Sequence, residues 1–124
     1  MNMNPEISVR LVLDDQGNPV VIKSGNVSHY KIEVATENIP DDVYAANYQL
    51  HESYISPFRE EREKENSFKF KTTTYGDYSI AASLLGKKKN YLTSTQISKA
   101  LAKSHKDELG NSKIKEALDH IKGH

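Results

Sequence analysis

The sequence predicts an all-β protein, an antiparallel β-sandwich followed by a short α-helical extension. Before Gly86, apolar and polar residues alternate in several short runs, which is the pattern of half-buried strands. Clusters of turn-forming residues separate these runs, and no helical pattern lies between them. After residue 95 the apolar residues recur at the spacing of a helix. We therefore expect a sandwich of five or six strands over residues 1–95 and two short helices over residues 96–124.

The N-terminal half contains four predicted strands. In the first, the alternating apolar residues are Ile7, Val9, Leu11 and Leu13. A turn cluster at residues 14–19 ends this strand, and residues 20–22 predict a short return. After a turn at residues 24–26, the next strand has its apolar positions at Tyr30, Ile32 and Val34. The fourth strand is expected to place four side chains on one face, namely Tyr44, Ala46, Tyr48 and Leu50.

The middle of the chain is strongly charged and then returns to alternation. Residues 60–66 are too polar for a core and predict a solvated connection with room for one turn of helix. Two further strands follow, joined through residues 75–77, and their apolar positions are Phe68 and Phe70 in one and Tyr78, Ile80, Ala82 and Leu84 in the other. Residues 91–95 fit either a last strand or the start of a helix.

The C-terminal extension is predicted to contain two helices. The first begins near Gln96 and is expected to stop at Gly110, and its apolar residues are Ile97, Ala100 and Leu101. Asn111 or Ser112 is suited to cap a second helix, whose apolar stripe is Ile114, Ala117, Leu118 and Ile121. Because a short helix is marginal alone, this stripe must be buried. It can pack on the sandwich or the first helix, on a second copy of the chain as a homo-oligomer, or on another partner.

The composition limits the classes to which the chain can belong. Its 124 residues, 36% of them apolar and 27% charged, fit one folded domain with a modest core. There is no cysteine, which excludes disulfides, thiolate zinc sites and cysteine nucleophiles. No apolar run approaches the roughly 20 residues that span a bilayer, and the N-terminus lacks a signal-peptide pattern. We expect a cytoplasmic protein without a membrane partner, or a nuclear one if the source is eukaryotic.

The charges are balanced overall but unevenly distributed along the chain. Residues 1–86 contain thirteen acidic and eight basic residues, whereas residues 87–124 contain four acidic residues and nine lysines. An acidic body favours a basic partner. We expect the lysines of the tail to form solvated helix faces, although a nucleic-acid partner is a minor alternative for them.

Two polar and aromatic segments follow predicted strands and give the strongest indication of function. The first is Leu50-His51-Glu52-Ser53-Tyr54, with Pro57 and Arg59 behind it, and the second is Thr74-Tyr75-Gly76-Asp77-Tyr78. Since each ends an alternating run, we expect two loops at one end of the β-structure that form a small pocket. The pair resembles the YEATS domain, in which a Leu-His-x-Ser-aromatic loop precedes Pro and Arg, and a second loop carries a glycine between aromatics. The resemblance covers about residues 5–95 and is dense over residues 43–84.

The resemblance implies an immunoglobulin-like fold and a non-enzymatic module that binds an acylated lysine, or a similar flat amide, on a protein. Family members hold the acyl-amide between two aromatic rings, while a serine hydroxyl and a main-chain N–H bind the amide group. Carried over to this sequence, the ligand-binding residues are His51, Ser53, Tyr54, Thr74, Tyr75, Gly76 and Tyr78. His51 and Tyr78 are expected to orient Ser53 and to line the pocket. No catalytic residue, metal or cofactor is implied.

The chain departs from the family pattern at three points. Thr74 stands where a glycine is common, and His29 lies near a histidine of the family without the usual neighbours of that histidine. The chain also contains no tryptophan. It is therefore most similar to divergent relatives, the prokaryotic YEATS-like domains.

Enzymatic chemistry is not indicated by the residues. His51, Glu52 and Ser53 are adjacent, but alternation in an extended segment points Glu52 away from its two neighbours. A Ser-His-acid triad needs that acid on the histidine. The five histidines are scattered, and none of them belongs to an HExxH motif of a metalloprotease site.

Three hypotheses of function remain. The first is a reader that binds an acylated-lysine protein or peptide. The second is a protein-protein interaction or sensor module of a prokaryotic defence or signalling system, with a decayed acyl-lysine pocket. The third is a nucleic-acid accessory that uses the basic tail, and its binding would weaken steeply with salt.

Overall fold

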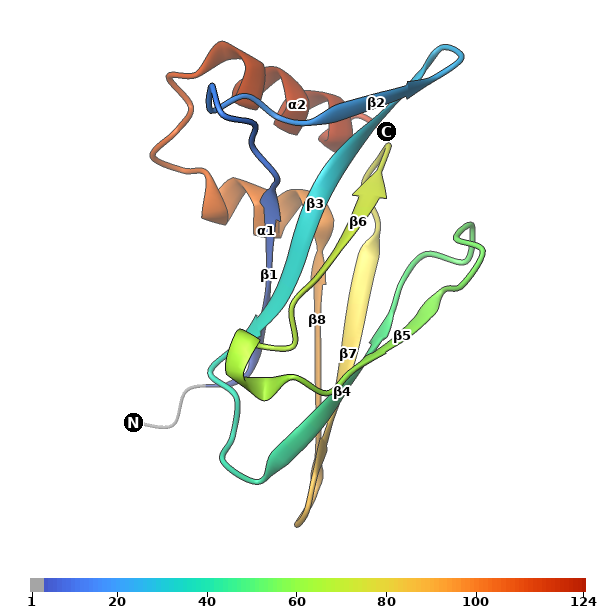
Figure 1. The fold of residues 1–124 in the computed structure, drawn as a ribbon, viewed down its shortest axis with the longest axis vertical. Coiled ribbons are helices and arrows are strands. Elements are labelled where there is room, and N and C mark those ends of the chain that lie inside the picture. The colour runs from blue at the N-terminus through green and yellow to red at the C-terminus, as the bar shows by residue number, and fades with distance from the viewer. Residues whose placement is uncertain (1–3) are drawn as a thin grey trace.

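Two antiparallel β-sheets face each other in the computed structural model, which describes residues 4–124 (Figure 1). The described residues form eight strands: β1 (Glu6–Leu11), β2 (Val21–Ser24), β3 (Val27–Glu37), β4 (Val43–Gln49), β5 (Phe58–Glu61), β6 (Phe70–Thr74), β7 (Ser79–Gly86) and β8 (Asn90–Gln96). They also form a single 3₁₀ turn, η1 (Lys64–Asn66), and two helices, α1 (Ile97–Ser104) and α2 (Ser112–Lys122). The predicted fold class is confirmed: an immunoglobulin-like antiparallel β-sandwich with a short C-terminal helical extension.

The first sheet is built around the long strand β3. Strands β1 and β2 pair with β3, and β6 pairs with it as well. Val34 of β3 lies opposite Val9 of β1 and opposite Phe70 of β6. All three side chains are buried, so this register places the apolar positions of three strands on the inner face.

The second sheet has the strand order β5-β4-β7-β8. Strands β6 and β7 follow one another in the chain but belong to different sheets. Residues 75–78 therefore cross from one sheet to the other rather than closing a hairpin. The crossing meets the loop after β4, because the Tyr54 and Tyr78 rings lie 5.8 Å apart in an edge-to-face arrangement.

The strand count exceeds the prediction of five or six. The charged segment that was predicted as a connection begins inside β5, which forms one edge of the second sheet. Residues 91–95, for which a strand and a helix start were both open, belong to β8. The predicted single turn of helix in the charged segment is present as η1.

Three predicted positions also differ from the structure. Tyr44 is 44% exposed because the β4 register shifts between Val43 and Ala45, which turns Tyr44 away from the buried face of its strand. Phe68 is buried but lies outside β6, in a left-handed conformation with a φ of 54°. Helix α1 ends at Ser104, before the predicted stop at Gly110.

Tyr48 lies at the centre of the core between the sheets. Its side chain is fully buried, and its hydroxyl donates to the carbonyl of Phe68 at 3.1 Å. The hydroxyl of Thr36 lies 2.6 Å from the Tyr48 hydroxyl and donates to it, since the Tyr48 proton is already used. Burial raises the pKa of Tyr48 to about 12, so this polar group stays neutral and hydrogen-bonded inside an apolar core.

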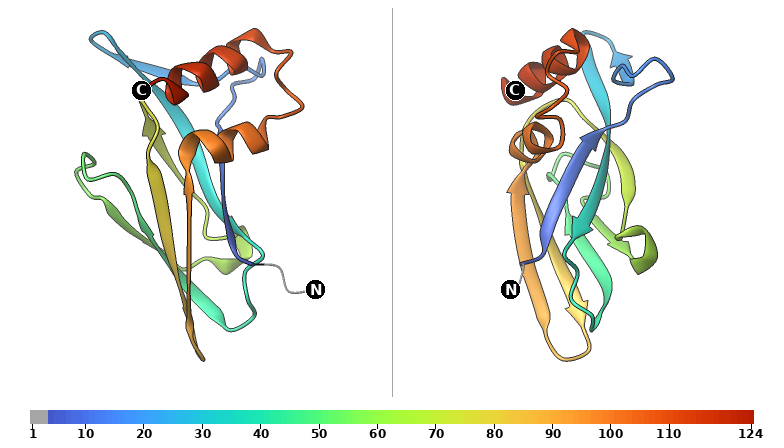
Figure 2. Two further views of the ribbon diagram at one scale, coloured as in Figure 1. Left: turned by 180° about the vertical axis from the view of Figure 1, so that it is seen from behind. Right: turned by 90° about the vertical axis from the view of Figure 1, so that its left-hand side faces the viewer.

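The two helices cover one end of the sandwich (Figure 2). Helix α1 follows β8 directly and packs on β1, and its Ile97 and Leu101 are fully buried in the same core as the strands. The side chain of Asn111 caps α2 by accepting the N–H groups of Lys113 and Ile114, as predicted. The apolar stripe of α2 is buried within the chain itself, through Ile114, Ala117 and Ile121 with Leu118 partly buried.

His105 fastens the end of α1 to β1. Its side chain is fully buried, and its Nε2 accepts the main-chain N–H of Leu11 at 2.9 Å. Its Nδ1 therefore carries the proton, which it donates to Glu108 at 3.1 Å. Neither helix in the described part of the chain is long and apolar enough to cross a membrane.

Candidate functional site

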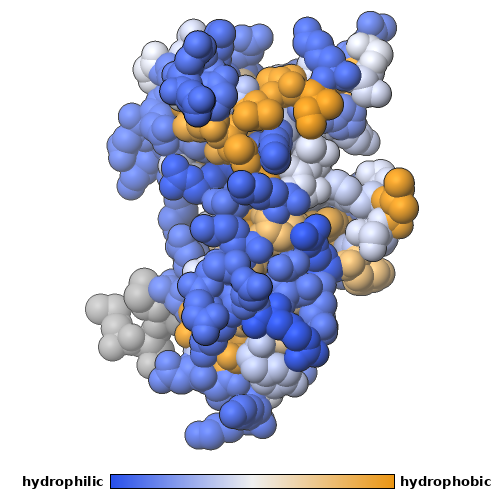
Figure 3. All heavy atoms as spheres, in the orientation of Figure 1, coloured by the Kyte–Doolittle hydropathy of each residue, from blue (hydrophilic) through white to orange (hydrophobic). Residues whose placement is uncertain are grey.

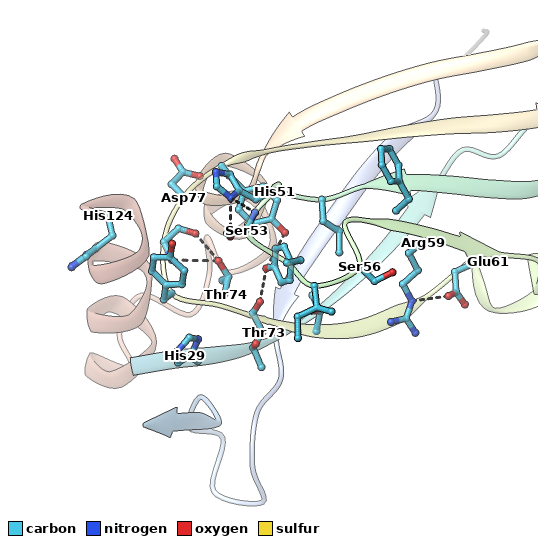
Figure 4. A pocket seen from close by; sticks show the side chains of 18 of the residues that line it. His29, His51, Ser53, Ser56, Arg59, Glu61, Thr73, Thr74, Asp77 and His124 are labelled. Carbon is cyan, nitrogen blue, oxygen red and sulfur yellow. Dashed lines mark hydrogen bonds and ion pairs between the residues drawn. The ribbon is translucent and has the colours of Figure 1, made fainter. Parts of the chain in front are cut away.

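A groove of about 820 Å³ opens between the loop after β4 and the crossing from β6 to β7 (Figure 4). All seven residues predicted to bind a ligand line it: His51, Ser53, Tyr54, Thr74, Tyr75, Gly76 and Tyr78. The structure thus brings the two predicted segments together. His124 lies at one end of the groove and the ion pair of Arg59 and Glu61 at the other.

His51 fixes the direction of the Ser53 hydroxyl. The Nδ1 of His51 accepts the main-chain N–H of Ser53 at 3.1 Å and lies 2.8 Å from the Ser53 Oγ. A ring nitrogen that accepts an N–H carries no proton, so the serine hydroxyl must donate to it. The lone pairs of Ser53 Oγ then remain to accept a hydrogen bond. Because Ser53 is exposed, that acceptor is within reach of a ligand.

Tyr54 and Tyr78 join the two loops through their hydroxyls. Tyr78 donates to the Tyr54 hydroxyl at 3.2 Å, and Tyr54 donates to the carbonyl of Thr73 at 2.5 Å. Burial raises the pKa of both tyrosines, and for Tyr78 the hydrogen bond to Tyr54 raises it further. Both hydroxyls are therefore neutral and engaged within the protein. What these two side chains present to a ligand is their aromatic surface.

Besides Tyr78, the second loop contributes the ring of Tyr75 and the main-chain N–H of that residue. Tyr75 is 46% exposed, and its ring meets that of His29 edge to face, with centroids 5.7 Å apart. Thr74 is buried behind it, and its hydroxyl donates to the carbonyl of Gly76 at 2.6 Å. Tyr75 lies just beyond β6, and no partner for its main-chain N–H occurs within residues 4–124.

The second loop is held from behind by both helices. Asp77 accepts the N–H of Ser98 at 2.9 Å and its hydroxyl at 2.6 Å, which ties the loop to the first turn of α1. Gly76 lies against His124, two residues beyond the end of α2, since a Cβ added to Gly76 would lie 3.0 Å from backbone and side-chain atoms of His124. A larger residue at position 76 would therefore require His124 to move by a few tenths of an ångström.

The carboxylates along the groove already have partners. Asp77 is bound to Ser98, Glu61 to Arg59 at 2.8 Å and Glu60 to Arg62 at 3.0 Å. A free ammonium group would therefore find no uncommitted carboxylate among these three.

Neither a metal-ligand cluster nor a Ser-His-acid triad is found among residues 4–124. In the part of the chain that the structure describes, no three His, Cys, Asp or Glu side chains are placed to hold a metal ion. The contact between Ser53 and His51 belongs to a local turn, because the same Nδ1 also accepts the N–H of Ser53. No carboxylate is hydrogen-bonded to His51 within residues 4–124, which leaves the histidine without the acid of a triad.

Several residues of the groove were outside the predicted set. Strands β5 and β6 supply part of its wall, with Phe58, Glu61, Thr72 and Thr73 among the lining residues. Alternation predicted the strand that contains Phe70, but β5 was not predicted as a strand, and no pattern indicated that the two strands would line one groove. His124 also lines the groove, and no local pattern indicates this because the contact depends on how α2 packs.

No family model and no curated protein matches the chain. Among solved structures it is similar to YEATS domains of the yeast protein Yaf9, the family that the two loop segments resemble. A Yaf9 YEATS domain recognising an H3K122suc peptide is 15% identical, with a TM-score of 0.49, over 76% of this chain and 71% of that one. A Yaf9 YEATS domain bound to H3K27ac is 16% identical, with a TM-score of 0.47, over 76% and 70%. Another structure of Yaf9, described as the yeast AF-9 homologue, is 14% identical, with a TM-score of 0.44, over 77% and 70%.

Proposed function

We propose that this protein is a non-enzymatic binding module that recognises an acylated lysine on a protein or peptide. One observation carries the proposal: the groove pairs an acceptor with a donor. The Ser53 hydroxyl donates its hydrogen bond to His51, so its oxygen can still accept one, while the N–H of Tyr75 is without a partner within residues 4–124 and can donate. A secondary amide offers one N–H and one carbonyl, which these two groups complement.

The aromatic side chains suit the rest of an acyl-amide. Tyr54, Tyr75 and Tyr78 all line the groove, and the rings of Tyr54 and Tyr78 meet edge to face. A flat, polarised group gains about 0.5–1.5 kcal/mol from each good aromatic contact beyond its burial. With about 0.5–1.5 kcal/mol from each hydrogen bond, the expected affinity is micromolar or weaker.

The same groove disfavours an unmodified lysine. An ammonium group loses its hydration on entering and needs a carboxylate in return. Asp77, Glu60 and Glu61 are all engaged by other side chains of the protein. Acylation removes the charge, and with it the cost of burying the charge.

Isothermal titration calorimetry with acetylated, crotonylated and unmodified lysine peptides tests the proposal. We expect an acylated peptide to bind, the unmodified one to bind at least about tenfold more weakly, and the Tyr75→Ala variant to lose most of the binding. Tyr44→Ala is the matched control, because Tyr44 is 44% exposed and Tyr75 46%, yet Tyr44 does not line the groove. Absence of binding to both acylated peptides would refute the function.

A further inference from the structure

The outer faces of the two sheets differ in charge. On the first sheet, Arg10, Glu33 and Lys71 lie side by side across β1, β3 and β6, and hydrophilic side chains dominate this side of the molecule (Figure 3). On the second sheet, no outward-facing residue of β4, β7 or β8 is charged, although 27% of the chain is. Two rows of residues across these strands form what we call the neutral face: Asn47, Ser83 and Leu92, and next to them Gln49, Ala81 and Ser94. Depletion of charge is what distinguishes the centre of a protein interface from other surface.

The neutral face is also open and hollowed. Leu92 is 83% exposed, and Phe58, which lies beside Gln49 on the neighbouring strand β5, is 69% exposed. The small side chains of Ala81 and Ser83 lie between them and leave a hollow of about 420 Å³. The two helices lie at the end of the sandwich and not over this face (Figure 2). Large apolar side chains beside an uncovered hollow are typical of a contact that a partner completes.

The charges around the neutral face indicate which partner fits it. Strand β5 adds one outward-facing charge to this sheet, Glu60, which is paired with Arg62 at 3.0 Å. A charged partner therefore finds no free counter-charge on these four strands. In a symmetric contact between two copies of the chain, each residue near the axis meets its own counterpart, so a charged residue there would be repelled by its like. A neutral face fulfils this condition.

The direction and the size of the contact follow from the same strands. If the strands of the two copies run antiparallel, the lysine-rich turns at residues 87–89 lie at opposite ends of the contact. Three spacings of about 4.8 Å between strands and five residues of about 3.4 Å along them give a face of roughly 14 by 17 Å. This is small beside the roughly 800 Å² that each partner buries in a standard interface, so we expect a weak dimer with a dissociation constant of about 0.1 mM.

We propose that the neutral face is a self-association surface, on which two copies of the chain stack with antiparallel strands. Leu92 of each copy packs into the hollow over Ala81 and Ser83 of the other. The contact does not use the apolar stripe of α2, which is buried within the chain. It also uses none of the seven residues predicted to bind a ligand, so it stands independently of the proposed acyl-lysine site.

Sedimentation velocity from about 10 µM to about 1 mM protein, with NMR spectra over the same dilution series, tests the proposal. We expect the sedimentation coefficient to rise with concentration towards that of a dimer. The amide signals of Asn47, Ser83 and Leu92 should shift on dilution, whereas those of Arg10 and Glu33 on the other sheet should not. A chain that stays monomeric at 1 mM would overturn the proposal and leave the neutral face to a different protein. A dimer whose shifts lie on another face would overturn it as well.

Substitutions that place a charge on the neutral face locate the contact. Leu92→Lys should weaken self-association at least about tenfold, because the contact would bury an ammonium group without a carboxylate. Ser94→Lys, at a second exposed position of the face, should act in the same direction. Ile55→Lys is the matched control: it makes the same change at a fully exposed side chain outside the face and should alter association less than about twofold. Circular dichroism should show all three variants folded, and association of both face variants as strong as that of the wild type would refute the contact.

Discussion

The two loops that line the groove are held in different ways. The loop after β4 is mostly exposed and is organised by its own side chains, through the contact of His51 with Ser53. The crossing from β6 to β7 is fixed from outside, because Thr74 and Gly76 are buried and Asp77 is bound to α1. The first loop can adjust to a ligand at little structural cost, whereas the second serves as a fixed frame. Substitutions of Thr74, Gly76 and Asp77, the residues that hold the second loop, should therefore act on folding, whereas substitutions of the exposed Ser53 in the first loop should act on binding.

Thr74→Val gives the largest expected effect. The substitution keeps the shape of a side chain that is 3% exposed but removes the hydroxyl that donates to the Gly76 carbonyl at 2.6 Å. A buried carbonyl left without its donor costs about 1–3 kcal/mol. Urea unfolding should show this loss in the free energy of unfolding. Thr73→Val is the control, because Thr73 lies further from the core, and a similar loss for both variants would contradict the special role of Thr74.

Asp77→Ala is expected to have the next largest effect. Removing the carboxylate takes away the acceptor for the Ser98 N–H and hydroxyl in the first turn of α1. The loss of such a cap costs about 0.5–2 kcal/mol. Thermal unfolding followed by circular dichroism measures it, with Asp77→Asn as the control that keeps a side-chain oxygen. An unchanged melting temperature in Asp77→Ala would show that the position of the second loop does not depend on its contact with α1.

The fold was predictable from the sequence where alternation is regular. Val9, Val34 and Ile80 lie in runs of period two and are buried as that period requires. Tyr44 was misplaced because a register shift in β4 leaves no trace in the alternation. Part of β5 was read as a connection because its charges look solvated, whereas Arg59 covers the ring of Phe70 at 4.7 Å and pairs with Glu61.

The candidate site was predictable only in its local parts. His51, Ser53 and Tyr54 are neighbours in the chain, so their grouping could be seen in the sequence. The contact of His124 with Gly76 joins residues from distant parts of the chain through the packing of α2. The facing edges of β5 and β6 likewise depend on how the two sheets are placed, which no short motif encodes.

Tyr78→Phe tests the link between the two loops and has a moderate expected effect. The substitution removes the hydrogen bond to Tyr54 and should cost about 0.5–1.5 kcal/mol at neutral pH. Burial raises the folded-state pKa of both tyrosines above the ordinary value of 10.0. Above about pH 10 the unfolded chain therefore loses these protons first, and stability falls as the pH rises further. Below about pH 10 both tyrosines are protonated in the folded and the unfolded chain, so they should not make the free energy of unfolding depend on pH.

Unfolding measurements at alkaline pH distinguish the hydrogen bond between Tyr78 and Tyr54 from simple packing of the two rings. With one fewer buried tyrosine to ionise, Tyr78→Phe should lose stability less steeply than the wild type above about pH 10. Urea unfolding at a series of alkaline pH values measures the two slopes. Identical slopes would mean that the Tyr78 hydroxyl is not protected by the folded state, and the link between the loops would then have to be apolar.

Ser53→Ala should have the smallest effect on folding and a clear effect on binding. Ser53 is exposed, and its hydroxyl bonds only within its own loop, to His51. Its removal should therefore change the free energy of unfolding by less than about 0.5 kcal/mol. The same substitution deletes the acceptor proposed for the ligand N–H, which should weaken an acetylated peptide about two- to tenfold. His51→Ala should give part of that loss, because Ser53 keeps its hydroxyl but loses the group that orients it. If Ser53→Ala destabilises the fold as much as Thr74→Val does, the first loop is a structural frame like the second, and the contrast between the two loops fails.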